Sequence, residues 1–183
     1  MILESSILGQ LEYDEEKIIT FPQGIIAFEQ YKRYLLVENQ DQHNPLWWLQ
    51  SVDEPDLLFT VINPFVIKPD YNFELAPGDV EDLGIEKRED LVVLSIVVVP
   101  EDFKKMTANL LAPVVINARL KKGKQIILQD KNYSPKHLII EELQQRSSGQ
   151  QARPSKTPSS RQGTQTGPSK EECCHVGADP KKR

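Results

Sequence analysis

The run Leu91–Val99 is apolar and β-branched almost throughout, and Pro100 ends it. Such a run is far too short to span a bilayer, and β-branched residues favour strands. A strand with one face in water would alternate apolar and polar residues, whereas this run is apolar at nearly every position. The sequence therefore predicts a strand that is buried on both faces.

Further short apolar runs, separated by Pro, Gly, Asn and Asp, predict more strands. They are Ile18–Phe21, Tyr34–Val37, Leu46–Ser51, Leu57–Ile62, Val114–Asn117 and Gln125–Leu128. The last two flank Lys121–Lys124, which predicts a hairpin with Gly123 at positive φ. Many short strands at close spacing are typical of a β-sandwich or a β-barrel.

Helical signals are few. Asp79–Leu83 predicts a single helical turn, capped by Asp79 and ended by Gly84. Ser134-Pro135 is a typical N-cap and first-position pair, so it predicts a helix over Lys136–Arg146. The fold class that we predict is mainly β, with a few short helical turns.

Composition changes sharply after Arg146. Residues 147–183 contain no aromatic residue, and Ser, Thr, Gln, Gly and Pro fill 21 of these 37 positions. Such a segment buries too little apolar surface to offset the entropy cost of ordering it. We therefore predict one β domain over residues 1–146 and a disordered, basic C-terminal tail over residues 147–183.

Charge divides at the same boundary. Residues 1–146 carry 15 Lys and Arg against 24 Asp and Glu, a net charge of −9, whereas the tail has a net charge of +4. An acidic domain disfavours nucleic acid, because phosphate contacts need Lys and Arg. It favours a basic protein partner, although acidity also serves simply to keep a protein in solution.

The same sequence predicts a cytoplasmic protein that does not enter a membrane. Met1–Ser6 has no basic segment followed by an apolar run, so no secretory signal is visible. Both cysteines, Cys173 and Cys174, fall in the tail, so the predicted domain has no disulfide.

Residues that commonly carry chemistry do not form a recognisable site. His43, His137 and His175 have no second ligand at metal spacing within the domain, and Cys173-Cys174-His175 is an incomplete metal site. Several carboxylates lie in charged turns, where a solvated acidic face is favoured over catalysis. They are Asp79, Glu81, Asp82, Glu86, Glu89 and Asp90. We predict no catalytic residue, no cofactor and no metal.

Several motifs, in order, resemble the FliW family of flagellar assembly factors over roughly residues 1–139. The most specific segment is Met106–Asn117, which runs from a polar turn into a β-branched strand. The others are Phe21–Ile25 followed by Phe28-Glu29, Leu49–Ser51, Asn63–Phe65, Pro69–Leu75, Gly123–Gln125 and Tyr133–His137. Two positions depart from the family pattern: Ala27 stands where Gly is usual, and Leu111 where a polar residue is common.

The resemblance implies a small antiparallel β-barrel-like domain without catalytic activity. It also implies two partners, flagellin and the RNA-binding translational repressor CsrA. Binding of CsrA would relieve repression of flagellin mRNA, and accumulating flagellin would compete for the same protein. Competition of this kind depends on the relative affinities of the two ligands. We expect the free protein to be a monomer.

Exposed aromatic residues rimmed by acids are typical of protein-binding patches. The motifs therefore predict a set of partner-binding residues: Asp70, Tyr71, Phe73, Glu74, Thr107, Asn109 and Asn117. Two alternatives stay open for these residues: the aromatic side chains belong to the core, and the two asparagines hold turns at strand ends. For the whole protein the alternatives are a small β-domain enzyme or a structural subunit that uses the acidic face.

Overall fold

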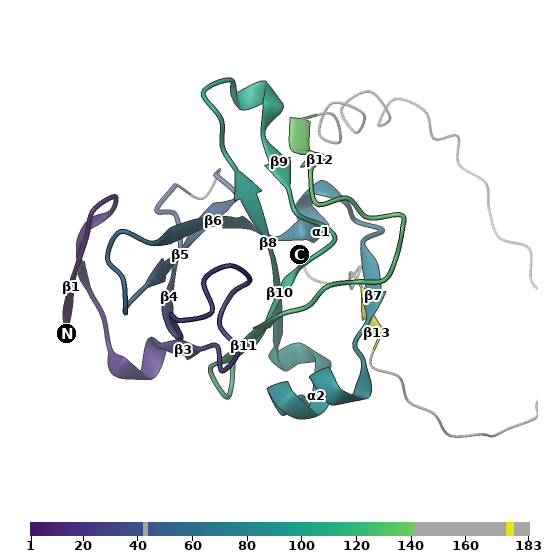
Figure 1. Cartoon of the computed structure of the whole chain (residues 1–183), viewed down its shortest axis with the longest axis horizontal. Coiled ribbons are helices and arrows are strands. Elements are labelled where there is room, and N and C mark those ends of the chain that lie inside the picture. The colour runs from purple at the N-terminus through teal and green to yellow at the C-terminus, as the bar shows by residue number, and fades with distance from the viewer. Residues whose placement is uncertain (42–43, 141–174, 178–183) are drawn as a thin grey trace, which may run out of the picture.

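The computed structural model describes residues 1–41, 44–140 and 175–177 (Figure 1). The first strands are β1 (Ile2–Ser5), β2 (Gly9–Glu12), β3 (Ile19–Thr20), β4 (Arg33–Val37), β5 (Leu46–Ser51), β6 (Leu58–Ile62) and β7 (Asn72–Glu74). The later strands are β8 (Leu91–Val98), β9 (Thr107–Ala108), β10 (Val114–Asn117), β11 (Lys122–Gln125), β12 (His137–Leu138) and β13 (His175–Gly177). The α-helices are α1 (Pro64–Ile67) and α2 (Pro77–Leu83), and 3₁₀ turns span Glu15–Lys17, Arg88–Asp90 and Phe103–Lys105.

Seven of the described strands close a barrel, in the order β3-β4-β5-β6-β8-β10-β11 and back to β3 (Figure 1). Each neighbouring pair in this ring is antiparallel except β11 and β3, which pair in parallel through Lys122 and Thr20 alone. Strands β9 and β12 extend the sheet beyond β8. The predicted β-barrel-like fold is therefore confirmed.

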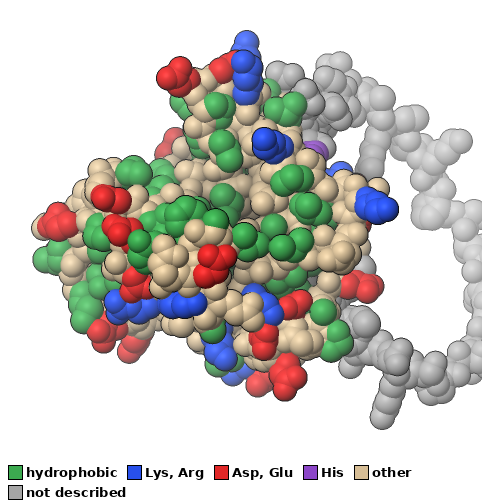
Figure 2. All heavy atoms as spheres, viewed as in Figure 1, with side chains coloured by type: hydrophobic (Ala, Val, Ile, Leu, Met, Phe, Trp, Pro, Cys, Tyr) green, Lys and Arg blue, Asp and Glu red, His purple; other side chains and the backbone are tan. Residues whose placement is uncertain are grey.

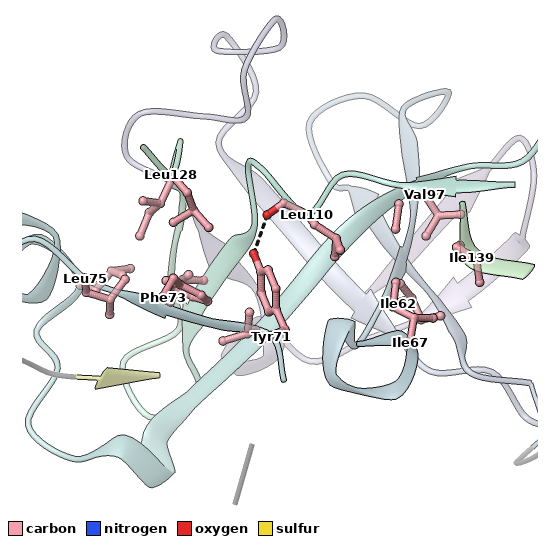
Figure 3. Packing of buried hydrophobic residues seen from close by; sticks show 14 residues of the cluster. Ile62, Ile67, Tyr71, Phe73, Leu75, Val97, Leu110, Leu128 and Ile139 are labelled. Carbon is pink, nitrogen blue, oxygen red and sulfur yellow. Dashed lines mark hydrogen bonds between the residues drawn. The ribbon is translucent and has the colours of Figure 1, made fainter. Parts of the chain in front are cut away.

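The barrel wall separates two apolar clusters, which explains the composition of β8. Leu94 faces the interior cluster, to which all ring strands except β11 contribute a buried residue. Its neighbour Val93 faces a second cluster outside the wall, formed with α1, β7, α2 and the segment after β11 (Figure 3). Successive side chains of a strand point to opposite faces, so both faces of β8 need apolar residues, as predicted.

The loop between β3 and β4 holds the motif Phe21–Ile25. Gly24 adopts a φ of +74°, and a Cβ atom there would lie 2.5 Å from the Cα of Glu29. Only glycine permits both this backbone conformation and this close approach. The motif therefore shapes a loop, and Gln125 fastens that loop to β11 by accepting a hydrogen bond from the backbone N–H of Ile26 (3.1 Å).

The predicted hairpin exists, but its turn lies earlier than expected. Strand β11 spans Lys122–Gln125 rather than Gln125–Leu128, and Lys121, with a φ of +53°, provides the left-handed residue of the turn. Gly123 is not at positive φ: it lies in the strand, where a Cβ atom would overlap the ring of Phe21. The glycine is needed for close packing and not for a turn.

Both predicted helices differ from the structure at their starts. Helix α2 begins at Pro77 after Ala76, so Asp79 is not its cap, whereas Gly84 ends it in the left-handed conformation as predicted. The helix predicted from Lys136 is wrong at His137–Leu138, because these residues pair with β9 as β12. Ile139 and Ile140 are helical, as predicted, and the remainder from residue 141 lies outside the described residues.

The predicted tail, residues 147–183, lies outside the described residues except for three positions. His175–Gly177 form β13, which pairs antiparallel with β7 where no secondary structure was predicted. In Figure 1 this short strand lies beside β7, on the side of the molecule away from β1.

Candidate partner-binding surface

The predicted partner-binding residues divide by exposure. Tyr71, Phe73 and Asn117 are buried, with 0%, 6% and 0% of their surface exposed. Asp70 and Glu74 are exposed, and Thr107 and Asn109 are half-buried. A partner that docks on the folded protein therefore reaches the two carboxylates directly but not the aromatic rings between them.

Tyr71 joins two of the predicted segments. Its hydroxyl donates a hydrogen bond to the backbone oxygen of Leu110 over 2.7 Å, which places the start of β7 beside the segment after β9 (Figure 3). Burial raises the pKa of this phenol well above its ordinary value. A neutral, buried hydroxyl with a good acceptor is a structural anchor.

Tyr133 is a residue of this region that the predicted set omits. Its hydroxyl accepts a hydrogen bond from the backbone N–H of Asn72 (2.9 Å) and donates one to the backbone oxygen of Asn72 (2.7 Å). Its ring packs edge-on against Tyr71, with centroids 4.7 Å apart. Its place in the Tyr133–His137 motif was the available signal, but nothing in the sequence connects it to β7.

Both asparagines hold turns, as the alternative interpretation proposed. Asn109 accepts a hydrogen bond from the backbone N–H of Ala112 over 2.9 Å. Asn117 donates from its amide to the backbone oxygens of Leu83 and Gly84, at 3.1 and 3.0 Å, and thereby ties β10 to the end of α2. Asn117 thus acts at α2, whereas Asp70 lies just before β7 and Glu74 is the last residue of β7.

An open groove runs beside β7 and contains one of the two exposed acids. We call it the β7 groove; it is lined by Asn72, Phe73, Glu74, Leu128, Gln129 and Asp130. Glu74 and Asp130 give it a negative charge, while Asp70 nearby pairs with Lys68 at 3.3 Å. An open, acidic groove along a strand suits a protein or peptide ligand better than a small molecule.

The other predicted acids mostly form ion pairs that hold elements together. The Lys124 amine lies 2.7 Å from a carboxylate oxygen of Asp79 and 2.7 Å from one of Asp82, which clamps α2 onto β11. Hydrogen bonds to these two carboxylates raise the pKa of Lys124. Arg119 pairs with Glu86 and Asp90. Figure 2 shows Asp and Glu spread over the visible face rather than gathered in one place.

Neither a metal centre nor a membrane-crossing helix is found among the residues with described positions. No group of three or more His, Cys, Asp or Glu side chains there is arranged to hold a metal ion. No helix in the same residues has the length and apolar character needed to cross a bilayer. Cys173 and Cys174 lie outside the described residues.

Comparisons with known proteins agree on one family. The model of the FliW protein family matches residues 2–139. The flagellar assembly factor FliW of Alkaliphilus metalliredigens is 49% identical over 144 residues, which cover 79% of this chain and 89% of that protein. The same factor from Caldicellulosiruptor saccharolyticus is 46% identical, over 78% and 92%. A crystal structure of the flagellar assembly factor FliW superimposes with a TM-score of 0.71 at 36% identity and covers 76% of this chain and 96% of that chain.

Proposed function

The chain belongs to the FliW family of flagellar assembly factors, and from this premise we propose that it acts by binding two proteins in turn, flagellin and the translational repressor CsrA. In this role the protein performs no catalytic step. While flagellin is scarce, the protein holds CsrA and so frees flagellin mRNA for translation. As flagellin accumulates, it takes the protein away from CsrA. CsrA acts, and flagellin is made, where mRNA is translated, so in this role the protein works in the cytoplasm.

Charge supports this function. CsrA must be basic where it holds RNA, and residues 1–146 of this chain carry a net charge of −9. Opposite charges on two proteins accelerate their encounter and do so most at low salt. Because the domain is acidic, direct competition for the mRNA itself is disfavoured. The protein would therefore act on the repressor and not on its RNA.

Two exposed acids support particular contact residues: Glu74, which lines the β7 groove, and Asp70, which lies two residues before β7. Asp70 and Glu74 are exposed on either side of two aromatic rings that fix the backbone of β7 in the core. A rigid backbone with exposed acids presents its charges at fixed positions and loses little entropy on binding. We therefore propose that CsrA contacts Asp70 and Glu74.

A charge-reversal pair tests the role of these two acids. We expect Asp70→Lys/Glu74→Lys to slow association with CsrA by roughly tenfold at low salt, because mutations of steering charges act mainly on the association rate. The matched control is Glu15→Lys/Glu16→Lys, which makes the same charge change at exposed residues of the first 3₁₀ turn. Stopped-flow mixing gives both rates. Equal slowing in both variants would remove Asp70 and Glu74 from the interface.

The partner exchange itself is tested by size-exclusion chromatography with light scattering. The purified protein is mixed with CsrA and with flagellin from the same cell, first separately and then together. Discrete complexes, with flagellin displacing CsrA, are the expected result. If the folded protein forms no complex with either partner, the proposal is overturned.

A further inference from the structure

Strand β7 lies outside the barrel, and its only strand partner among the described residues is β13. The register sets Glu74 opposite His175, Phe73 opposite Val176 and Asn72 opposite Gly177. These partners are separated by about a hundred positions of sequence, and the family match ends at residue 139. The covering strand thus belongs to a part of the chain beyond the family's shared domain.

The backbone N–H and C=O groups on the two edges of β7 have different hydrogen-bond partners. On one edge, the backbone N–H and C=O of Asn72 both bond to the hydroxyl of Tyr133. In an extended strand the backbone polar groups of successive residues point to opposite edges, so those of Phe73 point away from Tyr133. Val176 is the residue opposite Phe73. Strand β13 therefore occupies the edge of β7 to which no other described strand pairs.

That edge of β7 is rigid. The side chains of Tyr71, Phe73 and Leu75 are buried in the outer apolar cluster, and the ring centroids of Tyr71 and Phe73 lie 5.4 Å apart. An anchored strand with an unpaired edge is a ready template for another extended segment. Main-chain hydrogen bonds then give affinity for almost any extended sequence, and flanking side chains give selectivity.

We propose that the outer edge of β7 is a strand-docking site and that residues 175–177 of the same chain occupy it as an internal competitor. The docked strand pairs with Glu74, one of the two residues to which the proposed function assigns CsrA binding, so it must leave before a partner pairs with this edge. The gating part of the inference rests on that proposed function. The docking part does not.

Charge and connectivity both favour docking within one molecule. Residues 147–183 carry a net charge of +4, whereas residues 1–146 carry −9. Because the strand is covalently attached, its docking does not depend on protein concentration. A partner then binds only the undocked molecules. Its apparent dissociation constant is therefore the intrinsic constant divided by the undocked fraction.

Hydrogen exchange on the full-length protein tests docking without any partner. Val176→Pro removes the backbone N–H opposite Phe73 and disfavours a strand. We expect the Phe73 amide to exchange at least about tenfold faster in this variant than in the parent protein. Val176→Thr keeps the N–H and the β-branch and should leave the rate unchanged, as should Gln162→Pro, which introduces proline elsewhere in the tail. Equal exchange in the parent and Val176→Pro would overturn the docking.

A synthetic peptide spanning residues 171–180, added under reducing conditions to Val176→Pro, provides the converse test. It should restore slow exchange at Phe73, because the edge of β7 is then empty and accepts the strand from solution. A peptide of the same composition in scrambled order, with proline at the central position, is the control. Failure of the native peptide at millimolar concentration would contradict a docking site.

Partner binding tests the gating separately. Val176→Pro should bind CsrA or flagellin at least about threefold more tightly than the parent protein, whereas Val176→Thr should not. If exchange at Phe73 responds but neither affinity changes, the gating is overturned and the docking stands. If no variant binds either partner, the proposed function fails, and the exchange data still decide whether β13 docks.

Discussion

Ala27 adopts a backbone conformation that alanine disfavours. Its φ is +71°, in the loop between β3 and β4, and its N–H donates to the Glu29 carboxylate over 2.9 Å. A left-handed backbone costs an L-residue roughly 1–2 kcal/mol because Cβ crowds the following carbonyl. Glycine, which the resemblance to the FliW pattern leads us to expect at this position, has no Cβ and avoids that contact.

Replacing Ala27 by glycine should therefore stabilise the protein. We expect Ala27→Gly to raise the free energy of unfolding by about 0.5–1 kcal/mol, since relief of strain exceeds the extra entropy that glycine loses on folding. Urea unfolding at equilibrium measures the change. Ala118→Gly, at a non-glycine residue whose φ is not positive, is the control and should destabilise. A loss of stability in Ala27→Gly would show that the loop carries no strain.

The two buried tyrosines Tyr34 and Tyr71 should respond in opposite ways to loss of the hydroxyl. The Tyr34 hydroxyl is buried and finds no hydrogen-bond partner among the described residues, and burial raises its pKa to about 12. Tyr34→Phe should leave the free energy of unfolding unchanged or raise it by up to about 1 kcal/mol. Tyr71→Phe should lower it by about 1–2 kcal/mol, because the Leu110 carbonyl loses its donor.

Equilibrium urea unfolding of the two variants measures this contrast. Where the slope of the unfolding free energy against urea is unchanged, the shift of the midpoint gives the change in stability. A clear destabilisation by Tyr34→Phe would mean that the hydroxyl makes a stabilising contact after all.

At the scale of single residues, the motif positions could be predicted from the sequence, but the roles of their side chains could not. Tyr71 and Phe73 sit two residues apart beside two acids, a pattern that fits an exposed patch and a buried edge equally well. Burial was decided by contacts with Leu110 and Tyr133, about 40 and 60 positions away. Contacts between residues so far apart cannot be predicted from local patterns in a single sequence.

Among the connections between elements, Asp53 joins the start of β4 to the turn after β5. Its carboxylate accepts hydrogen bonds from the backbone N–H groups of Lys32 and Arg33, at 2.8 and 2.9 Å, and from the Arg33 side chain at 2.7 Å. Burial alone would raise the pKa of this carboxyl, but these three donors and the charge of Arg33 outweigh burial and hold it below its ordinary value of 3.8.

Because this pKa is lowered in the folded protein, the contribution of Asp53 to stability depends on pH. The charged carboxylate stabilises the fold above the unfolded-state pKa of about 3.9, and that stability is lost as the pH falls through the lower folded-state pKa. Asp53→Asn should cost about 1 kcal/mol at pH 7, and the difference from the parent should shrink below about pH 3.9. Thermal unfolding of both proteins between pH 7 and pH 2 checks this. A difference that stays constant would contradict it.

Strands were predicted well where turn residues mark their ends. Strand β5 has the predicted bounds. Strand β8 ends at Val98, one residue before the predicted end at Val99. The predictions were wrong where one residue type is compatible with two structural roles. The pattern around Gly123 predicts a turn residue, but the structure uses this glycine to make room for Phe21. Ser134-Pro135 is typical of a helix start, but pairing with β9 makes His137 and Leu138 a strand.

For the whole molecule, the pairing between β3 and β11 is the weakest join of the barrel. It consists of one residue pair, Lys122 with Thr20, supported by a hydrogen bond from the Thr20 N–H to the Lys121 oxygen at 2.8 Å. Strand β8, by contrast, pairs with β6, β9 and β10. Local opening should therefore begin between β3 and β11.

Native-state hydrogen exchange should reveal this order. We expect the Thr20 amide to exchange at least about tenfold faster than the amides of Val93 and Leu94, because opening one pair costs less free energy than unfolding the centre of the sheet. Exchange of both groups at one common rate would mean that the barrel opens only as a unit.

The parallel pairing of β3 with β11 also bears on synthesis of the protein. Thr20 and Lys122 lie more than half of the printed sequence apart, and at 5–20 residues per second the ribosome needs roughly 5–20 s to travel between them. In the later part of that time, once β6 has been made, the growing chain carries a meander of β3 to β6 whose first edge has no partner. An unpaired edge invites association with other chains, so the nascent protein is most vulnerable to aggregation, and most in need of a chaperone, just before its last barrel strand leaves the ribosome.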